Sequence, residues 1–331
     1  MEVSAPAVPQ LLLLLGVVLL FILLLALRYI ICSPRPARIP FANRHVFITG
    51  GSSGIGLELA KLALEEGAHV SIMARDLSRL TQAKLAIANA TGKEVNIYCA
   101  DVNDFESVSA VAREAGSIDI LICSHGISIP KSLEDASLVE INQMLDTNLR
   151  GNLHVIKAML PSLKNRKDHC GSIAIISSQA GQVGVYGYAA YSASKFGLKG
   201  MAEALQQEIH CYNIRVSIIY PPDTCTPGFG KENETKPEIT KVISGCSTAM
   251  DAVDVARKAV DGIKAGNFSI SCNFDGWMLC IATAGMSPQP SAVLAFAEIF
   301  LSGILRLVGL CYIWTWYQTL VKWTKQHNKD K

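Results

Sequence analysis

The residues best suited to chemistry are Tyr191 and Lys195, which stand four apart in a stretch whose pattern predicts a helix. Side chains with this spacing lie on one helix face, so both can reach the same substrate oxygen and the same cofactor. An ammonium group beside a phenol stabilises the phenolate, and we therefore expect the pKa of Tyr191 to be lowered from about 10. Such a tyrosine can act as a general acid and base.

Two further polar residues could join this pair. Ser178 stands thirteen residues before Tyr191, at the end of a predicted strand, and Asn148 lies in a long predicted helix upstream. A tyrosine and a lysine at this spacing are common by chance, but the serine and an upstream glycine-rich segment make the combination specific. Together these residues predict proton transfer at a substrate oxygen.

The glycine-rich segment runs from Gly50 to Gly56 and joins a β-branched stretch to a predicted helix. Glycines in such a turn let the backbone bend sharply and approach a pyrophosphate, which the helix N-terminus attracts. An ordinary strand-to-helix turn is the alternative, but the position after the first strand of an alternating pattern favours a dinucleotide. The candidate cofactor contacts here are Gly50, Ser52, Ser53, Gly54, Ile55 and Gly56.

Two arginines, Arg75 and Arg79, follow the second predicted strand, which ends at Ala74. An acidic residue at this strand tip binds the ribose 2′-hydroxyl of NAD, whereas a basic residue favours the 2′-phosphate of NADP. Arg75 occupies the tip, so the sequence predicts NADPH as the cofactor. The alternative is that both arginines are simply solvated at the start of a helix.

These candidates require a scaffold of alternating strands and helices, and the pattern from His45 onward predicts one. Short β-branched runs predict strands at 46–49, 70–74, 95–99, 118–123, 172–177 and 215–220. The stretches between them predict helices at 56–66, 77–90, 105–115, 138–160 and 188–210. Such alternation gives right-handed crossovers and a parallel sheet covered on both faces. The expected fold is α/β, a Rossmann-type doubly wound parallel sheet.

Composition narrows the class of protein further. The chain has 331 residues, a net charge of +2, 50% hydrophobic residues and 18% charged residues. The low charged fraction predicts that part of the chain lies in lipid, the apolar content excludes disorder for most of its length, and the near-neutral charge gives no support for a nucleic-acid partner. The ten cysteines form no CxxC pair and the seven histidines no HExxH pattern. We therefore expect no metal site and reduced thiols in a cytosol-facing domain.

An N-terminal apolar run extends over residues 11–32, after a short tail at 1–10. About 20 apolar residues at 1.5 Å each match a bilayer core, so we expect a transmembrane helix. A cleaved signal peptide is the alternative; it is disfavoured because no Lys or Arg precedes the run and no small-residue cleavage site follows it. Basic residues follow the span while only Glu2 precedes it, which places the main domain in the cytosol. These basic residues are Arg28, Arg35, Arg38 and Arg44.

Further along the chain we expect a linker at 33–44, stiffened by Ser33-Pro34-Arg35-Pro36, and an NADP-binding catalytic domain at 45–275. Residues 276–321 form a second apolar, membrane-associated region with aromatic side chains near its end, and a basic tail follows at 322–331. Aromatic residues and lysines at such an end suit a bilayer interface. A membrane-inserted hairpin, an interfacial amphipathic helix and a subunit-interface helix are the alternatives.

The segment TGxxxGxG, Ser178 and the YxxxK helix together resemble the short-chain dehydrogenase/reductase family. The resemblance implies that Tyr191 protonates a carbonyl oxygen as hydride arrives from the nicotinamide, and that Lys195 binds the nicotinamide ribose and tunes Tyr191. It implies further that Ser178, with Ser177 as the alternative, holds the carbonyl oxygen. Asn148 would carry a water that links Lys195 to solvent. A homo-oligomer is also common in this family.

Other positions match the family unevenly. Asp101 and Val102, after the third predicted strand, match the pair that contacts adenine in this family. The chain departs from the family pattern at Cys123-Ser124-His125-Gly126, where Asn-Asn-Ala-Gly is usual. His125 is the one histidine near the expected cofactor site, and we interpret it as a packing residue rather than a catalyst.

Several stretches resemble one membrane-bound branch of the family in particular. They are residues 177–182, 190–196, 220–229, 232–237 and 266–268. The branch reduces 3-ketodihydrosphingosine, a long-chain sphingoid ketone, to dihydrosphingosine (sphinganine), so the resemblance implies that substrate, NADPH as donor and the endoplasmic reticulum membrane as location. A membrane-anchored hydroxysteroid or retinoid dehydrogenase is the alternative enzyme. A catalytically silent scaffold of the same fold is the non-enzyme alternative.

Overall fold

The computed structural model describes residues 7–32, 37–165, 170–245 and 249–327. Its centre is a seven-stranded sheet in the order β3-β2-β1-β4-β5-β6-β9, in which every neighbouring pair is parallel. This order confirms the predicted Rossmann-type sheet. The strands are β1 (His45–Thr49), β2 (His69–Ala74), β3 (Asn96–Cys99), β4 (Ile120–Cys123), β5 (Gly171–Ile176), β6 (Ile214–Tyr220) and β9 (Ser269–Ser271).

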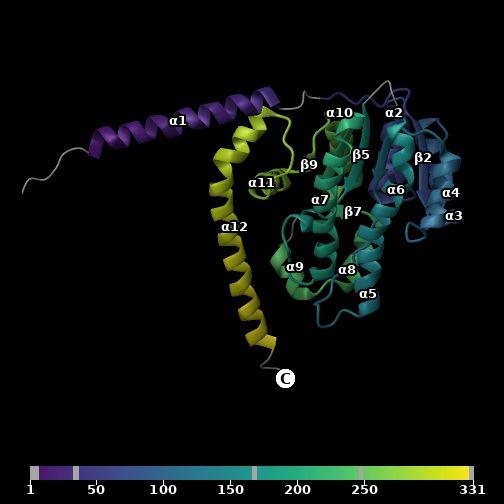
Figure 1. The fold of residues 1–331 in the computed structure, drawn as a ribbon. Coiled ribbons are helices and arrows are strands. Elements are labelled where there is room, and N and C mark those ends of the chain that lie inside the picture. The colour runs from purple at the N-terminus through teal and green to yellow at the C-terminus, as the bar shows by residue number, and fades with distance from the viewer. Residues whose placement is uncertain (1–6, 33–36, 166–169, 246–248, 328–331) are drawn as a thin grey trace, which may run out of the picture.

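Helices cover both faces of the sheet (Figure 1). One face packs against α2 (Gly54–Glu65), α3 (Leu77–Thr91) and α10 (Ala252–Lys264). The other face packs against α4 (Phe105–Ala115), α6 (Gly151–Lys164) and α7 (Ala189–Glu208). Two apolar cores therefore lie on opposite sides of one sheet.

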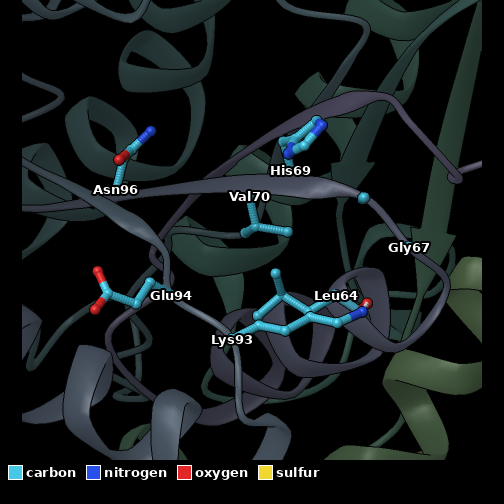
Figure 2. Close-up of a pocket in the computed structure, with 8 residues that line it drawn as sticks. Leu64, Gly67, His69, Val70, Lys93, Glu94 and Asn96 are labelled. Carbon is cyan, nitrogen blue, oxygen red and sulfur yellow. Dashed lines mark hydrogen bonds between the residues drawn. The ribbon is translucent and has the colours of Figure 1, made fainter.

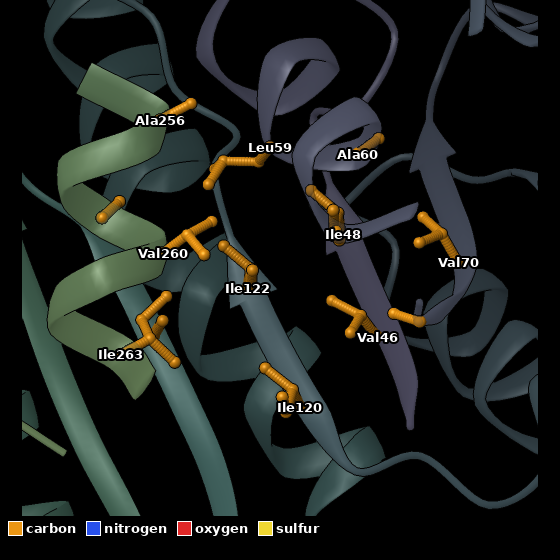
Figure 3. Close-up of a cluster of buried hydrophobic side chains, with 14 of the residues drawn as sticks. Val46, Ile48, Leu59, Ala60, Val70, Ile120, Ile122, Ala256, Val260 and Ile263 are labelled. Atoms are coloured by element: carbon orange, nitrogen blue, oxygen red, sulfur yellow. The ribbon is translucent and has the colours of Figure 1, made fainter. Parts of the chain in front are cut away.

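Alternation along each strand explains how one short segment supplies both cores. In β1, Val46 and Ile48 point into the first core while Phe47 points into the second. In β4, Ile120 and Ile122 belong to the first core as well, where they face Val260 and Ile263 of α10 (Figure 3). A strand buried on both faces must be apolar at every position, which is why these segments read as unbroken hydrophobic runs.

The structure differs from the predicted elements in the middle of the chain. The single helix predicted over 138–160 is instead α5 (Leu138–Leu145), a π-helical turn η1 (Asp146–Arg150) and α6. The π turn widens the backbone spiral at Asn148, and such turns are frequent at functional sites. The seventh strand, β9, was not predicted because three residues with serine at both ends carry no β-branched run.

The segment that connects β6 to α10, which we call the excursion, follows the last predicted strand. It contains the small strands β7 (Thr224–Cys225) and β8 (Met250–Asp251), which pair with each other, and the helices α8 (Pro227–Thr235) and α9 (Glu238–Ser244). The hydroxyl of Thr240 in α9 donates to the carbonyl of Tyr186 at 3.0 Å, just before α7. The excursion is thereby held beside the start of α7.

Two long apolar helices, α1 (Ala7–Cys32) and α12 (Ala292–His327), extend away from the sheet (Figure 1). Both are long and apolar enough to cross a membrane. Only 0% of the most apolar stretch of α1 and 6% of that of α12 is buried, so neither is a core helix. The Tyr29 hydroxyl of α1 donates to the carbonyl of Gln289, just before α12. The predicted linker residues 33–36 and the tail residues 328–331 lie outside the described residues.

The second apolar region divides into two parts with different surroundings. Its first part forms α11 (Phe274–Ala282), which contacts β9 and buries Gly276 and Ile281. Its second part is α12, one uninterrupted helix that contacts α11 and α9. A hairpin within α12 itself is therefore disfavoured, while a hairpin with α11 and α12 as its two arms stays an alternative. The amphipathic alternative is also disfavoured, because large apolar side chains are exposed along the whole length of α12.

Candidate active site

The turn from β1 into α2 is shaped for a pyrophosphate. Gly50 and Gly54 have φ angles of +69° and +55°, which residues with a Cβ rarely adopt. A Cβ on Gly56 would lie 2.3 Å from the carbonyl oxygen of Gly50, so only glycine fits there. The N-cap residue Ser53 makes no side-chain capping bond, so the first N–H groups of α2 are left without a side-chain cap, as an anion-binding helix N-terminus requires. These features fit the phosphates of a dinucleotide.

The remaining predicted residues of this turn line the same end of the sheet. Ser52 and Ile55 are both half-buried, and Ile55 packs against the first core. The turn is therefore anchored to the first core by one apolar side chain.

The two predicted arginines differ in their surroundings. Arg79 lies 3.7 Å from the Asp76 carboxylate, which also caps α3 by accepting from the Arg79 backbone N–H. Arg75 is exposed at the carboxyl end of β2, and no ion pair engages its guanidinium among the described residues. Arg75 is thus the better placed of the two to bind a 2′-phosphate.

Asp101 and Val102 lie just beyond β3, at the same edge of the sheet. One Asp101 oxygen accepts from the backbone N–H of Asn103 at 2.9 Å. Val102 is buried, and a Cβ on Gly151 would come within 2.7 Å of its side chain. Both residues lie at the sheet edge where the family pattern implies an adenine contact, and that contact stays a prediction.

His125 links the glycine turn to α6. Its Nδ1 lies 2.6 Å from the Thr49 hydroxyl, and its Nε2 lies 3.3 Å from the Asn152 amide nitrogen. Burial, and then the charge of Lys195, lowers the pKa of His125 to about 3. The ring is neutral near neutral pH and cannot supply a proton. This environment is that of a packing residue, and it gives the unusual Cys-Ser-His-Gly segment a structural role.

The chemical end of the site is built on the first turn of α7. The Ser178 side chain lies beside the Tyr191 phenol and acts to lower its pKa. Ser178 also caps the short 3-10 turn η2 (Gln179–Gly181), accepting from the Ala180 N–H at 3.1 Å. Ser177 points elsewhere and donates to the carbonyl of Lys195 at 3.1 Å. Of the two serines, Ser178 is therefore the one beside the tyrosine.

Lys195 lies one turn further along α7 and is buried. Its Nζ donates to the carbonyl of Ile176 at 3.0 Å and lies 5.6 Å from the centroid of the Tyr191 ring. Burial lowers the pKa of Lys195 to about 8. A cation placed here can reach a ribose hydroxyl and the region of the tyrosine together.

Asn148 sits in the π turn and ties three elements together. Its Oδ1 accepts from the Ile127 N–H at 2.8 Å, while its Nδ2 donates to the Ile127 carbonyl at 2.9 Å and to the Ser194 hydroxyl at 3.0 Å. Asn152 donates to the Asn148 carbonyl at 2.6 Å. The side chain of Asn148 is thus occupied by protein groups, and a water would have to use its backbone oxygen.

One expectation about Tyr191 is wrong. We expected its pKa to fall, but burial raises that pKa above 10; the carboxylates of Glu232 and Asp223 raise it further, and Ser178 opposes them. Lys195 is not among the groups that lower it, and its ammonium donates to the Ile176 carbonyl at 3.0 Å. The phenol is therefore protonated near neutral pH, which suits a residue that gives a proton to a carbonyl oxygen.

The sequence did not predict that four residues, Tyr188, Asp223, Glu232 and Lys236, gather near Tyr191. Lys236 of the excursion lies 3.4 Å from both Asp223 and Glu232, and the Tyr188 hydroxyl donates to Glu232 at 2.5 Å. The i,i+4 spacing of Glu232 and Lys236 is a sequence signal for a helical ion pair. Nothing in the sequence indicates that the pair packs against Tyr188.

A separate hollow of about 480 Å³ lies at the opposite edge of the sheet. Figure 2 shows it around His69, Val70 and Asn96, near the amino ends of β2 and β3. The Lys93 ammonium donates to the Leu64 carbonyl beside it at 2.6 Å. Ligands of open parallel sheets bind at the carboxyl ends of the strands, so this hollow is not the active site.

A family comparison agrees with this geometry. The model of the short chain dehydrogenase family matches residues 44–237, and the chain belongs to that family. Among its relatives, 3-dehydrosphinganine reductase TSC10A of Arabidopsis thaliana is 52% identical over 301 residues, covering 91% of this chain and 92% of the relative. The 3-ketodihydrosphingosine reductase of Bos taurus is 38% identical, covering 88% and 90%.

Solved structures share the fold. Levodione reductase superposes with a TM-score of 0.64 at 24% identity, covering 72% of this chain and 99% of that one. A short chain dehydrogenase from Burkholderia cenocepacia J2315, solved with NADP, has a TM-score of 0.63 at 20% identity and covers 75% of this chain and 95% of its own. The family and fold expected from the sequence are confirmed.

Proposed function

We propose that the protein is an NADPH-dependent reductase that converts the 3-keto group of 3-ketodihydrosphingosine to the alcohol of dihydrosphingosine (sphinganine) in sphingolipid biosynthesis. The observation that carries this proposal is the 52% identity, over 91% of the chain, with a relative named for this reaction. The contact between Ser178 and Tyr191 supports it, because a silent scaffold has no need of that contact.

The chain's own residues divide the chemistry among them. When bound, NADPH supplies the hydride that reduces the ketone carbon. The protonated Tyr191 gives its proton to the carbonyl oxygen, and Ser178 donates a hydrogen bond to the same oxygen. Lys195 binds the nicotinamide ribose from its buried position, while Arg75 binds the 2′-phosphate. The backbone at Gly50 to Gly56 holds the pyrophosphate.

We further propose that α1 and α12 lie in the endoplasmic reticulum membrane and that the sheet faces the cytosol. Arg28, near the carboxyl end of α1, and Arg38, after it, support this orientation. Arg44, counted with them from the sequence, is buried and donates to the Cys170 carbonyl at 2.8 Å, so it serves the fold. The bilayer is thus the proposed partner of both apolar helices. The formation of a homo-oligomer stays a prediction.

The test is substrate choice by the full-length protein in detergent or lipid. We expect NADPH oxidation with 3-ketodihydrosphingosine to exceed that with a ketosteroid or with retinal by at least about tenfold. Preference for the steroid or for retinal would favour the alternative dehydrogenase. No turnover of any of the three would favour the scaffold.

A further inference from the structure

A group of charged side chains lies beside Tyr191 that neither proton transfer nor cofactor binding uses. It consists of Asp223, Glu232 and Lys236, and we call it the charge cluster. The Lys236 Nζ lies 3.4 Å from Asp223 Oδ2 and 3.4 Å from Glu232 Oε1. Only 4% of the Lys236 side chain is exposed. Two carboxylates against one ammonium leave one negative charge in excess.

The charge cluster joins two stretches that the sequence had singled out separately. Asp223 follows β6 and belongs to the segment 220–229. Glu232 lies in the last turn of α8 and Lys236 directly follows that helix, so both belong to the segment 232–237. The Lys236 ammonium lies 5.7 Å from the centroid of the Tyr188 ring and 5.0 Å from that of Phe229. The lysine is therefore fixed by two carboxylates and two rings.

The charge cluster is linked to the catalytic tyrosine through Tyr188. Tyr188 donates to Glu232 at 2.5 Å, and its ring centroid is 5.8 Å from that of Tyr191. Both carboxylates are close enough to raise the pKa of Tyr191. One ammonium neutralises only one of the two carboxylates, and the negative charge left over beside a buried site costs desolvation energy unless a second cation binds there.

We propose that Asp223 and Glu232 bind the ammonium group on the carbon next to the substrate's ketone, and so select amino ketones over neutral ketones. This inference rests on the proposed function, whose substrate carries an amine at that carbon. Asp223 makes the first contact, because 35% of its side chain is exposed, against 13% for Glu232. Lys236 and Tyr188 hold the two carboxylates in place.

The main experiment compares two ketones of equal length in the full-length enzyme: 3-ketodihydrosphingosine and 1-hydroxy-3-octadecanone, which lacks the amine. Asp223→Asn should lower kcat/KM for the amino ketone by at least about tenfold, the usual loss when a charge-assisted hydrogen bond is removed. The loss for the neutral ketone should be clearly smaller, because that substrate has no ammonium group for the carboxylates to bind. Glu232→Gln should give the same selective loss.

The matched control is Glu234→Gln, which removes a carboxylate from the same helix at an exposed position. It should leave both ketones unaffected. Equal losses for both ketones in Asp223→Asn and Glu232→Gln would overturn the inference and leave the proposed function intact. Failure of the wild-type enzyme to reduce the amino ketone would instead overturn the proposed function.

A second measurement needs no variant, so a misfolded mutant cannot obscure the answer. The wild-type enzyme reduces the neutral ketone while octadecylamine or octadecanol is added to the same vesicles. We expect the amine to inhibit at least about tenfold more strongly than the alcohol of equal length. Equal inhibition by the two would contradict an ammonium site beside Tyr191.

Discussion

The cofactor end and the chemical end of this site are built by different means. At the cofactor end, the backbone forms most of the binding surface: glycine conformations and uncapped N–H groups shape the turn, and the exposed Arg75 lies at the tip of β2. At the chemical end, the site is formed by side chains that contact one another: Asn148 donates a hydrogen bond to Ser194, and Ser178 lies beside Tyr191. Backbone sites depend on local sequence, whereas side-chain networks depend on distant segments.

The comparison predicts that the two ends can be disabled separately, most strongly at the chemical end. Tyr191→Phe keeps the ring but removes the proton donor, so ketone reduction should fall by at least about 10²-fold. NADPH affinity, measured by fluorescence titration, should stay within about twofold, because the glycine turn is unchanged. Turnover close to wild type would mean that another group supplies the proton.

At the cofactor end, Arg75→Ala should weaken NADPH binding by about tenfold to a hundredfold, since the 2′-phosphate loses a charge-assisted partner of about 1.5–3 kcal/mol. NADH binding should barely change. Arg79→Ala is the matched control, and its effect should be smaller because Asp76 already engages that arginine. Equal weakening of both cofactors in Arg75→Ala would show that this residue does not read the phosphate.

His125 lies where the two ends meet, and it should make the fold sensitive to acid. Its folded pKa of about 3 is below its usual 6.5, so as pH falls through this window the unfolded chain takes up a proton that the native chain does not. Stability present above pH 6.5 should then be lost by up to about 1.4 kcal/mol per pH unit.

Urea unfolding at pH 7 and pH 5 measures this loss. His125→Gln should show a shallower dependence of the free energy of unfolding on pH than the wild type. His69→Gln changes an exposed histidine at the opposite edge of the sheet and should leave the dependence unaltered. A wild-type slope retained in His125→Gln would place the acid sensitivity elsewhere.

The smallest expected effect is an absence of glycan, because both ends are predicted to face the cytosol. Three sequons begin at Asn89, Asn233 and Asn267, and the first two asparagines are exposed. A glycosidase should therefore not shift the protein's mobility, and protease should digest the 40–270 region in sealed microsomes. Full protection of that region, or glycan on either exposed asparagine, would contradict the cytosolic orientation.

The sheet could be predicted from sequence because its signals are local. Five of the six predicted strands are apolar runs that are largely buried, the edge strand β3 is only partly buried, and each matches a strand of the structure within about two residues. The seventh strand, β9, and the π turn at Asn148 could not be predicted, because one is too short to show a pattern and the other depends on packing against Ile127.

The candidate site shows the same division. Gly50, Gly56 and Arg75 could be placed from motif spacing alone, because β1, β2 and their following turns are continuous in sequence. The raised pKa of Tyr191 could not, because it arises from burial and from Asp223 and Glu232, which come from a later part of the chain. Spacing identifies which residues meet, but the surroundings decide their protonation.

The position of α12 bears on how substrate concentration should be counted. This helix, apolar and exposed, contacts α9, which packs against the chain just before α7. With α12 in lipid, as proposed, a sphingoid ketone arrives by lateral diffusion within the same leaflet, and its mole fraction among the lipids replaces its molarity in water. Adding inert phospholipid to a fixed amount of enzyme and ketone should then slow turnover, although nothing in the aqueous phase has changed.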